Sequence, residues 1–135
     1  MSHTLLALLG FTSWALALLV LMEAIRSKLV LTREVAANSF NPANSNLSPF
    51  MQRLARAHAN CLEGLPIFGG LMVVAILAGK SNVTDPLAYA LVAARVIQST
   101  IHLASTSSAA VTARFVAFAV QVGIAIYWAA KLHGA

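Results

Sequence analysis

The stretch RLARAHANCLEGLPIF, residues 53–68, decides the fold, because it places several charged side chains directly before a long apolar run. At 100° per residue, Arg53, Arg56, Asn60 and Glu63 fall within about 80° of one another on a helix. One helical face therefore carries two cations, an amide and a carboxylate. Ionisable groups inside a bilayer are costly and normally face a bundle interior or a wet cavity. If this helix enters a membrane, its polar face must point into the protein.

The composition of the whole chain is typical of a membrane protein. Of its 135 residues, 59% are hydrophobic and 10% are charged, whereas soluble domains average about 45–50% apolar and about 25% charged residues. The net charge is +5, but the basic residues are spread out, which argues against nucleic-acid binding. The single cysteine, Cys61, excludes an intrachain disulfide. No Cys/His pairing has zinc spacing, so we predict no metal site.

Four segments are long and apolar enough to cross a bilayer, which takes about 20 residues each. The first starts with an uncharged run and lacks the basic start and cleavage site of a signal peptide, so we interpret it as a helix. A linker rich in Asn, Ser and Pro follows, and its last residues, Ser48-Pro49, read as a helix start. Asp85-Pro86 reads as another helix start. The predicted helices cover about residues 4–31, 49–79, 86–105 and 111–131 of a single domain.

The basic residues predict the orientation in the membrane. One side of the predicted spans carries two basic residues, Lys80 and Lys131. The other side, at the first connection, carries five basic residues: Arg26, Lys28, Arg33, Arg53 and Arg56. By the positive-inside rule, the linker is cytoplasmic and both termini lie outside. Glu23 lies one turn before Arg26, which favours an ion pair at the interface.

The charges within or near the predicted spans are unbalanced. They comprise four arginines and one carboxylate: Arg53, Arg56, Glu63, Arg95 and Arg114. Arg binds carboxylates through two parallel hydrogen bonds, so the surplus of guanidinium groups predicts an anionic ligand. Glu63 is then free to hold an amine. Lipid headgroups and phosphate fit the same charges, so charge alone does not choose the ligand.

The pattern R-x-x-R-A-x-x-N-x-x-E-x-x-P-x-F resembles the second-helix signature of the MAPEG family, the membrane-associated proteins in eicosanoid and glutathione metabolism. Seven residues fill it: Arg53, Arg56, Ala57, Asn60, Glu63, Pro66 and Phe68. The segment ARVIQSTIHLA, residues 94–104, is similar to the A-R-x-x-x-x-x-x-Y-L pattern of the third helix. His102 stands there in place of the tyrosine of many members. The resemblance extends over about residues 5–130.

The resemblance implies a four-helix transmembrane bundle that assembles as a homotrimer, with glutathione bound between neighbouring subunits. It implies that six residues bind glutathione: Arg53, Arg56, Asn60, Glu63, Arg95 and His102. It also implies that Arg114 stabilises the glutathione thiolate, because a cation lowers the pKa of a nearby thiol. We therefore expect a glutathione transferase for lipophilic electrophiles, with reduction of lipid hydroperoxides as a second activity. We expect it in a bacterial inner membrane, where substrates arrive through the lipid bilayer.

Structural interpretations remain open for the same residues. Arg53 fits an interfacial arginine that extends its charge to the water. Arg95 can pair with Glu63, and His102 can be a hydrogen-bonded structural histidine. Cys61 fits an inert buried thiol, because the reactive thiol would come from glutathione.

Two other functions compete with the transferase. One is a non-catalytic, lipid-binding scaffold of the same family, against which the retained signature argues. The other is a small four-helix transporter, which often needs a carboxylate embedded in the first helix. Glu23 lies at the end of that helix beside Arg26, so the sequence favours the transporter less.

Overall fold

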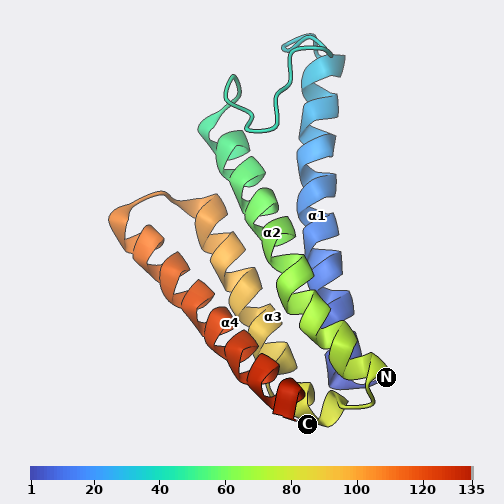
Figure 1. Ribbon diagram of the computed structural model, residues 1–135. Coiled ribbons are helices and arrows are strands. Elements are labelled where there is room, and N and C mark those ends of the chain that lie inside the picture. The colour runs from blue at the N-terminus through green and yellow to red at the C-terminus, as the bar shows by residue number, and fades with distance from the viewer. Residues whose placement is uncertain (135) are drawn as a thin grey trace.

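The computed structural model describes residues 1–134, which form four long helices. These are α1 (His3–Leu31), α2 (Pro49–Leu77), α3 (Ser81–Ala104) and α4 (Ser108–Gly134). Each helix is long and apolar enough to cross a membrane. Both chain ends lie at one end of the bundle, and the linker between α1 and α2 lies at the other (Figure 1). The predicted all-α, four-helix membrane fold is confirmed.

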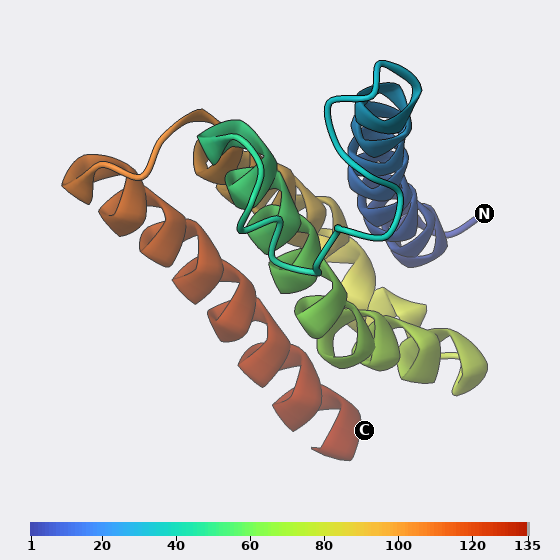
Figure 2. The ribbon, with the colours of Figure 1, turned by 90° about the horizontal axis from the view of Figure 1, so that it is seen from above.

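The pair α2 and α3 forms the middle of the bundle. Helix α1 packs against both of them, whereas α4 packs mainly against α3 and touches α2 much less. Helices α1 and α4 therefore lie on opposite sides, as the view from above shows (Figure 2). Large buried side chains fill the interior, among them Phe11, Leu54, Met72, Leu91 and Trp128. Because α4 approaches α2 so little, the space between these two helices is the place to look for a site.

Serine caps fix the starts of the first two helices. The hydroxyl of Ser2 accepts a hydrogen bond from the Leu5 amide at 3.1 Å, and that of Ser48 accepts one from the Met51 amide at 3.3 Å. Such caps satisfy backbone N–H groups that have no partner within the helix. Pro49 occupies the first position of α2, where its missing N–H costs nothing. The start of α2 therefore agrees with the prediction.

Helix α2 ends at Leu77, two residues before the predicted end, because a glycine in the left-handed conformation follows it. Gly79 has a φ of 69°, and its amide donates to the Ile76 carbonyl at 3.1 Å. The next amide, that of Lys80, donates to the Ala75 carbonyl at 2.7 Å. These two bonds form a Schellman motif, in which glycine tolerates the positive φ. The chain reverses within this motif and enters α3 directly.

Helix α3 starts at Ser81, so the start predicted at Pro86 is five residues late. Asp85 does not cap its own helix. Its carboxylate accepts hydrogen bonds from the backbone amide of Thr4, at 2.8 Å, and from the Thr4 hydroxyl. Pro86 sits inside the helix, where a proline removes one backbone hydrogen bond. The long-range bond to α1 therefore replaces the local cap that the sequence suggested.

A buried asparagine holds the linker between α1 and α2. Asn44 is 0% exposed and has a φ of 54°. Its side-chain amide donates to the Met51 carbonyl at 2.8 Å, and its side-chain oxygen accepts from the Arg26 guanidinium. Arg26 also donates to the Asn41 carbonyl and pairs with Glu23 at 3.2 Å, which confirms the predicted ion pair. These contacts join α1, the linker and α2.

Candidate functional site

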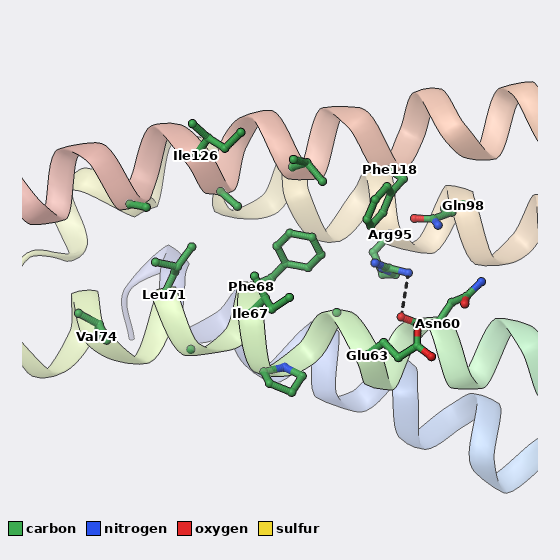
Figure 3. Close-up of a pocket in the computed structure, with 16 residues that line it drawn as sticks. Asn60, Glu63, Ile67, Phe68, Leu71, Val74, Arg95, Gln98, Phe118 and Ile126 are labelled. Atoms are coloured by element: carbon green, nitrogen blue, oxygen red, sulfur yellow. Dashed lines mark hydrogen bonds between the residues drawn. The ribbon is translucent and has the colours of Figure 1, made fainter.

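A groove of about 970 Å³ opens between α2 and α4, with α3 at its floor (Figure 3). This volume is at the upper end of ordinary ligand pockets, which measure about 300–1,000 Å³. One end of the groove is polar and is lined by Asn60, Glu63, Arg95 and Gln98. The rest is apolar, and its main walls are Ile67, Leu71 and Val74 of α2 and Phe118, Val122 and Ile126 of α4.

Arg95 of α3 is a buried cation at the polar end, only 1% exposed. Its Nη1 donates to the Asn60 backbone carbonyl at 3.4 Å, and its Nε and Nη2 have no partner within residues 1–134. The guanidinium lies 5.6 and 5.8 Å from the ring centroids of Phe11 and Phe68, close enough for cation–π attraction. No ion pair joins Arg95 to Glu63 in the described chain. The structural pairing that the sequence left open is therefore not formed.

Gly64 allows Arg95 to approach α2 so closely. A Cβ atom at this position would lie 2.8 Å from Nη2 of Arg95 and 3.0 Å from the ring of Phe68. Real Cβ atoms essentially never approach other atoms so closely, so any larger residue would displace one of these groups. Gly64 directly follows Glu63 in the sequence, but only the structure reveals what it does. It lets the guanidinium lie against the helical turn that carries Asn60 and Glu63.

The other four predicted residues form a basic cluster: Arg53, Arg56, His102 and Arg114. His102 is 3% exposed, and all three guanidinium groups are near enough to act on it electrostatically. Arg53 donates through Nε to the Leu103 carbonyl at 2.9 Å, which joins α2 to the last turn of α3. Arg56 is exposed. Three different helices thus contribute to the cluster, and the structure gathers the seven predicted residues into two adjoining groups.

Arg114 is the seventh residue of α4, because the helix starts at Ser108 and not near residue 111. The positive field of a helix N-terminus is confined to about the first turn. The predicted start near residue 111 would have placed Arg114 in the first turn, whereas the observed start places it beyond that turn, so its field comes from its own guanidinium. Its Nε is buried and has no partner within residues 1–134. His102 likewise makes no side-chain hydrogen bond with the described chain, so its structural interpretation lacks a partner there.

The sequence analysis did not predict Gln98 and Phe118, which line the groove, or Gln121, which lies beside it, as site residues. Gln121 of α4 donates through Nε2 to Oε1 of Gln98 at 2.8 Å, and both side chains are buried. This bond ties α4 to α3 beside the groove, while Oε1 of Gln121 has no partner within residues 1–134. Two glutamines in apolar helices are a signal that the sequence offered. Phe118 gave no such signal, since one more aromatic residue in a membrane helix is unremarkable.

The arrangement can hold an anion at one end and an apolar chain along the rest. The unpartnered nitrogens of Arg95 and Arg114 are donors for carboxylate or thiolate groups. Glu63, which is exposed and has no ion-pair partner in residues 1–134, can receive an ammonium group. No cluster of His, Cys, Asp or Glu within this part of the chain could hold a metal ion.

Comparison with known proteins agrees with these features. No curated protein and no solved structure gave a match. The model of the MAPEG family matches residues 4–133, nearly the whole chain. The matched range contains every residue of the groove and of the basic cluster. The resemblance seen in the signature of α2 thus extends to all four helices, and the chain belongs to the MAPEG family.

Proposed function

We propose that this protein is a membrane glutathione transferase that joins glutathione to lipophilic electrophiles. The observation that carries the proposal is Arg95, a fully buried cation with two unpartnered nitrogens at the polar end of an apolar groove. A buried charge without a partner is strongly unfavourable, so the site favours an anionic ligand. Membership of a family linked to glutathione supports glutathione as that ligand.

Glutathione carries two carboxylates, an ammonium group and a thiol, and the site offers a partner for each. We assign the carboxylates to the arginines of α2 and α3, because guanidinium groups bind carboxylates through paired hydrogen bonds. The ammonium group is assigned to Glu63, the exposed carboxylate of the groove. The complete set of proposed glutathione contacts is Arg53, Arg56, Asn60, Glu63, Arg95 and His102.

Arg114 is the proposed catalytic residue, acting on the glutathione sulfur. A free thiol has a pKa of about 8.5, so only a few per cent is thiolate at neutral pH. A guanidinium beside the sulfur favours the thiolate and lowers the thiol pKa. The thiolate then forms a bond to the electrophilic carbon. The leaving group departs with its electron pair, or, at a conjugated double bond, the displaced electrons take up a proton.

Peroxidase activity is the second proposed reaction of the same thiolate. Two glutathione molecules would supply two electrons and form the glutathione disulfide. The lipid hydroperoxide would be reduced to the corresponding alcohol and water. This reaction needs no residue beyond those proposed for transfer.

Assembly as a homotrimer in a bacterial inner membrane completes the proposal. In the single chain, Arg56 and Glu63 are exposed on a helix that crosses the membrane. Charged groups do not face lipid, so a neighbouring subunit is the natural cover for this face of α2. Glutathione would then bind between subunits, as the family resemblance implies.

A non-catalytic, lipid-binding scaffold is the second candidate, and the apolar end of the groove favours it. It leaves the basic cluster without a role. The transporter has less support, because Glu23, the carboxylate of α1, is paired with Arg26 beside the linker. Binding of glutathione separates the transferase from both alternatives.

Calorimetry with glutathione and the detergent-solubilised protein tests the ligand. In the proposed trimer, the contacts of Glu63 and Arg56 with glutathione would be buried between subunits. Removing one partner of a buried charged contact costs about 2–5 kcal/mol, so Glu63→Gln and Arg56→Ala should each weaken binding by such an amount. Lys131→Ala is the matched control, since Lys131 is exposed in the last turn of α4 and does not line the groove. If Glu63→Gln and Arg56→Ala both bind glutathione as tightly as the control, the polar face of α2 is only structural.

Ultraviolet absorbance of the bound thiolate against pH tests the chemistry. In Arg114→Leu the thiol pKa of bound glutathione should rise, since the cation is lost and burial disfavours the charged sulfur. In Arg95→Leu the binding of glutathione should weaken, while the thiol of the glutathione that still binds should keep its lowered pKa. The opposite pattern would transfer the catalytic role to Arg95. No change in either variant would favour the scaffold.

A further inference from the structure

We propose that Phe11 of α1 is a positioning residue of the candidate site: together with Phe68 of α2, its ring holds the Arg95 guanidinium in the place where the anionic ligand binds. This inference rests on the proposed function, because the ligand is taken to be glutathione. It adds α1 to the site, although the residues that line the groove all come from the other three helices.

Aromatic rings provide most of the attraction that the protein itself offers to the buried charge of Arg95. Within residues 1–134 this arginine forms no ion pair, and its one hydrogen bond, to the Asn60 carbonyl, is 3.4 Å long. Its guanidinium lies over two rings, 5.6 Å from the centroid of Phe11 and 5.8 Å from that of Phe68. Cation–π attraction is stronger when the cation and the ring are both removed from water. The two rings are therefore the main support of this guanidinium.

The two rings form a fixed surface, because they come from different helices and pack against each other. Their centroids are 6.3 Å apart and their planes are tilted by 45°, an arrangement within the favourable range for aromatic pairs. Phe11 is 0% exposed and Phe68 is 3% exposed, so close packing restricts both rings. Helix α1 also lies against α3 here, since a Cβ atom at Gly10 would stand 3.7 Å from Val92. The Phe11 ring thus supports Arg95 from the α1 side.

The position of the guanidinium matters because a carboxylate could capture it. Glu63 lines the same polar end of the groove, is exposed and has no ion-pair partner in residues 1–134. Opposite charges attract strongly where the dielectric constant is low, so a guanidinium released from its rings would move toward this carboxylate. Such a pair would neutralise both groups on which glutathione binding is proposed to depend. The aromatic pair therefore keeps Arg95 apart from Glu63 and available to the ligand.

Replacing Phe11 by residues with and without a ring tests this role. Glutathione binding to the purified protein in one detergent is measured by calorimetry, and thermal unfolding is followed in the same samples. Phe11→Leu should weaken binding roughly tenfold, most of the value of a desolvated cation–π contact. Phe11→Met, which has a similar volume to Phe11→Leu and also lacks a ring, should give the same loss. Phe11→Tyr keeps the ring and should bind within about twofold of wild type, although its buried hydroxyl lowers the melting temperature.

Phe40→Leu is the control for loss of a ring beside an arginine. The guanidinium of Arg26 lies over the Phe40 ring, 5.4 Å from its centroid. The contacts of that arginine with Asn44, Asn41 and Glu23 do not involve the ring and remain in the variant. The same substitution beside the same type of cation should therefore leave glutathione affinity at the wild-type value.

A double-mutant cycle with Arg95→Leu tests the contact in the protein without ligand. If the ring and the guanidinium attract each other, Phe11→Leu should lower the melting temperature less in the Arg95→Leu background than in wild type. A ring that only fills space would cause the same loss in both backgrounds. The cycle does not depend on glutathione, so it separates this inference from the proposed function.

The remaining outcomes overturn the inference in distinct ways. If Phe11→Leu binds glutathione as tightly as wild type, or if Phe11→Tyr or Phe40→Leu loses as much affinity as Phe11→Leu, the ring has no positioning role and the proposed function survives. If the changes in melting temperature simply add, the ring and the guanidinium do not interact. If wild type binds no glutathione although the cycle shows coupling, the contact exists but the proposed function fails, and the positioning role fails with it.

Discussion

Two arginines of this protein lie in surroundings that differ sharply. Arg26, at the end of α1, donates to the side chain of Asn44 and to the Asn41 carbonyl, and it pairs with Glu23. Arg95, in the middle of α3, is more deeply buried, yet it makes one hydrogen bond of 3.4 Å and leaves two nitrogens unpartnered within residues 1–134.

The difference separates a structural arginine from a binding arginine. A buried donor without a partner loses its hydration and gains little in return. A protein that holds one in place, beside two neighbouring aromatic rings and against a glycine, keeps a position ready for a ligand. Arg26 has no such vacancy, so we expect it to serve the linker alone. The predictions below test this division.

The largest effect is expected for Arg95→Leu. Glutathione affinity should fall by about 2–5 kcal/mol, because the anion loses a buried charged partner. The apparent melting temperature without ligand should not fall, since replacing an uncompensated buried charge by an apolar residue is often neutral or stabilising. Calorimetry and thermal unfolding in the same detergent measure the two quantities. Loss of stability with normal affinity would make Arg95 another structural arginine.

Asn44→Ala should give the opposite pattern. The Met51 carbonyl and the Arg26 guanidinium both lose a partner, and alanine in a left-handed backbone conformation adds about 1–2 kcal/mol. We expect a destabilisation of about 2–4 kcal/mol with unchanged glutathione affinity. Asn44→Gly removes the side chain but tolerates the backbone, so it should recover the conformational part. Weaker glutathione binding in stable protein would show that the linker belongs to the site.

A smaller effect is expected for Gly64→Ala. The new methyl group would displace Nη2 of Arg95 or the ring of Phe68, and such overpacking costs about 1–3 kcal/mol. The higher helix propensity of alanine offsets about 1 kcal/mol, so stability should change little. Glutathione affinity should fall by roughly tenfold, about 1.4 kcal/mol, because the guanidinium is moved from its position. An unchanged affinity would mean that Arg95 adjusts freely.

The smallest effect is the stability of Gly70→Ala. The methyl group meets no atom within 4 Å, so only the backbone contribution changes. Alanine should stabilise this helical position by about 0.5–1 kcal/mol, a change visible as a higher apparent melting temperature. The stability gain of Gly70→Ala therefore measures the helix-propensity contribution alone. Comparing it with the stability change of Gly64→Ala gives the cost of overpacking at Gly64. A destabilised Gly70→Ala would show that the groove is filled in the absence of ligand.

The sequence alone predicts the four helices and the polar face of α2 on which the candidate site is proposed. Apolar runs of membrane length and a fixed-spacing signature are local patterns, and both can be read residue by residue. The start of α3 was predicted too late because Asp85 was read as a local cap. Asp85 instead bonds to Thr4, which is 81 positions away in the chain. No local pattern reports such a partner.

The groove and the close packing at its polar end were not predictable from the sequence for the same reason. The close contact of Gly64 with Arg95 joins two helices and depends on how they pack. The small contact between α4 and α2 creates the groove, and it follows from the packing of α4 on α3. Residues that such packing places beside the groove, among them Phe118 and Gly70, carry no signal in sequence spacing. The signature identified the polar end and left the apolar end invisible.

The length of α2 determines how deep the polar end of the groove lies in the bilayer. The helix has 29 residues, about 43 Å at 1.5 Å per residue, whereas the hydrocarbon core is about 30 Å thick. Counted back from Leu77, about 20 residues fill that core and reach to near His58. Glu63 would then lie only about 7 Å below the headgroup region on the linker side. If glutathione is the ligand, it would need to enter the membrane no further than that, while a lipophilic substrate would reach the same point from the hydrocarbon.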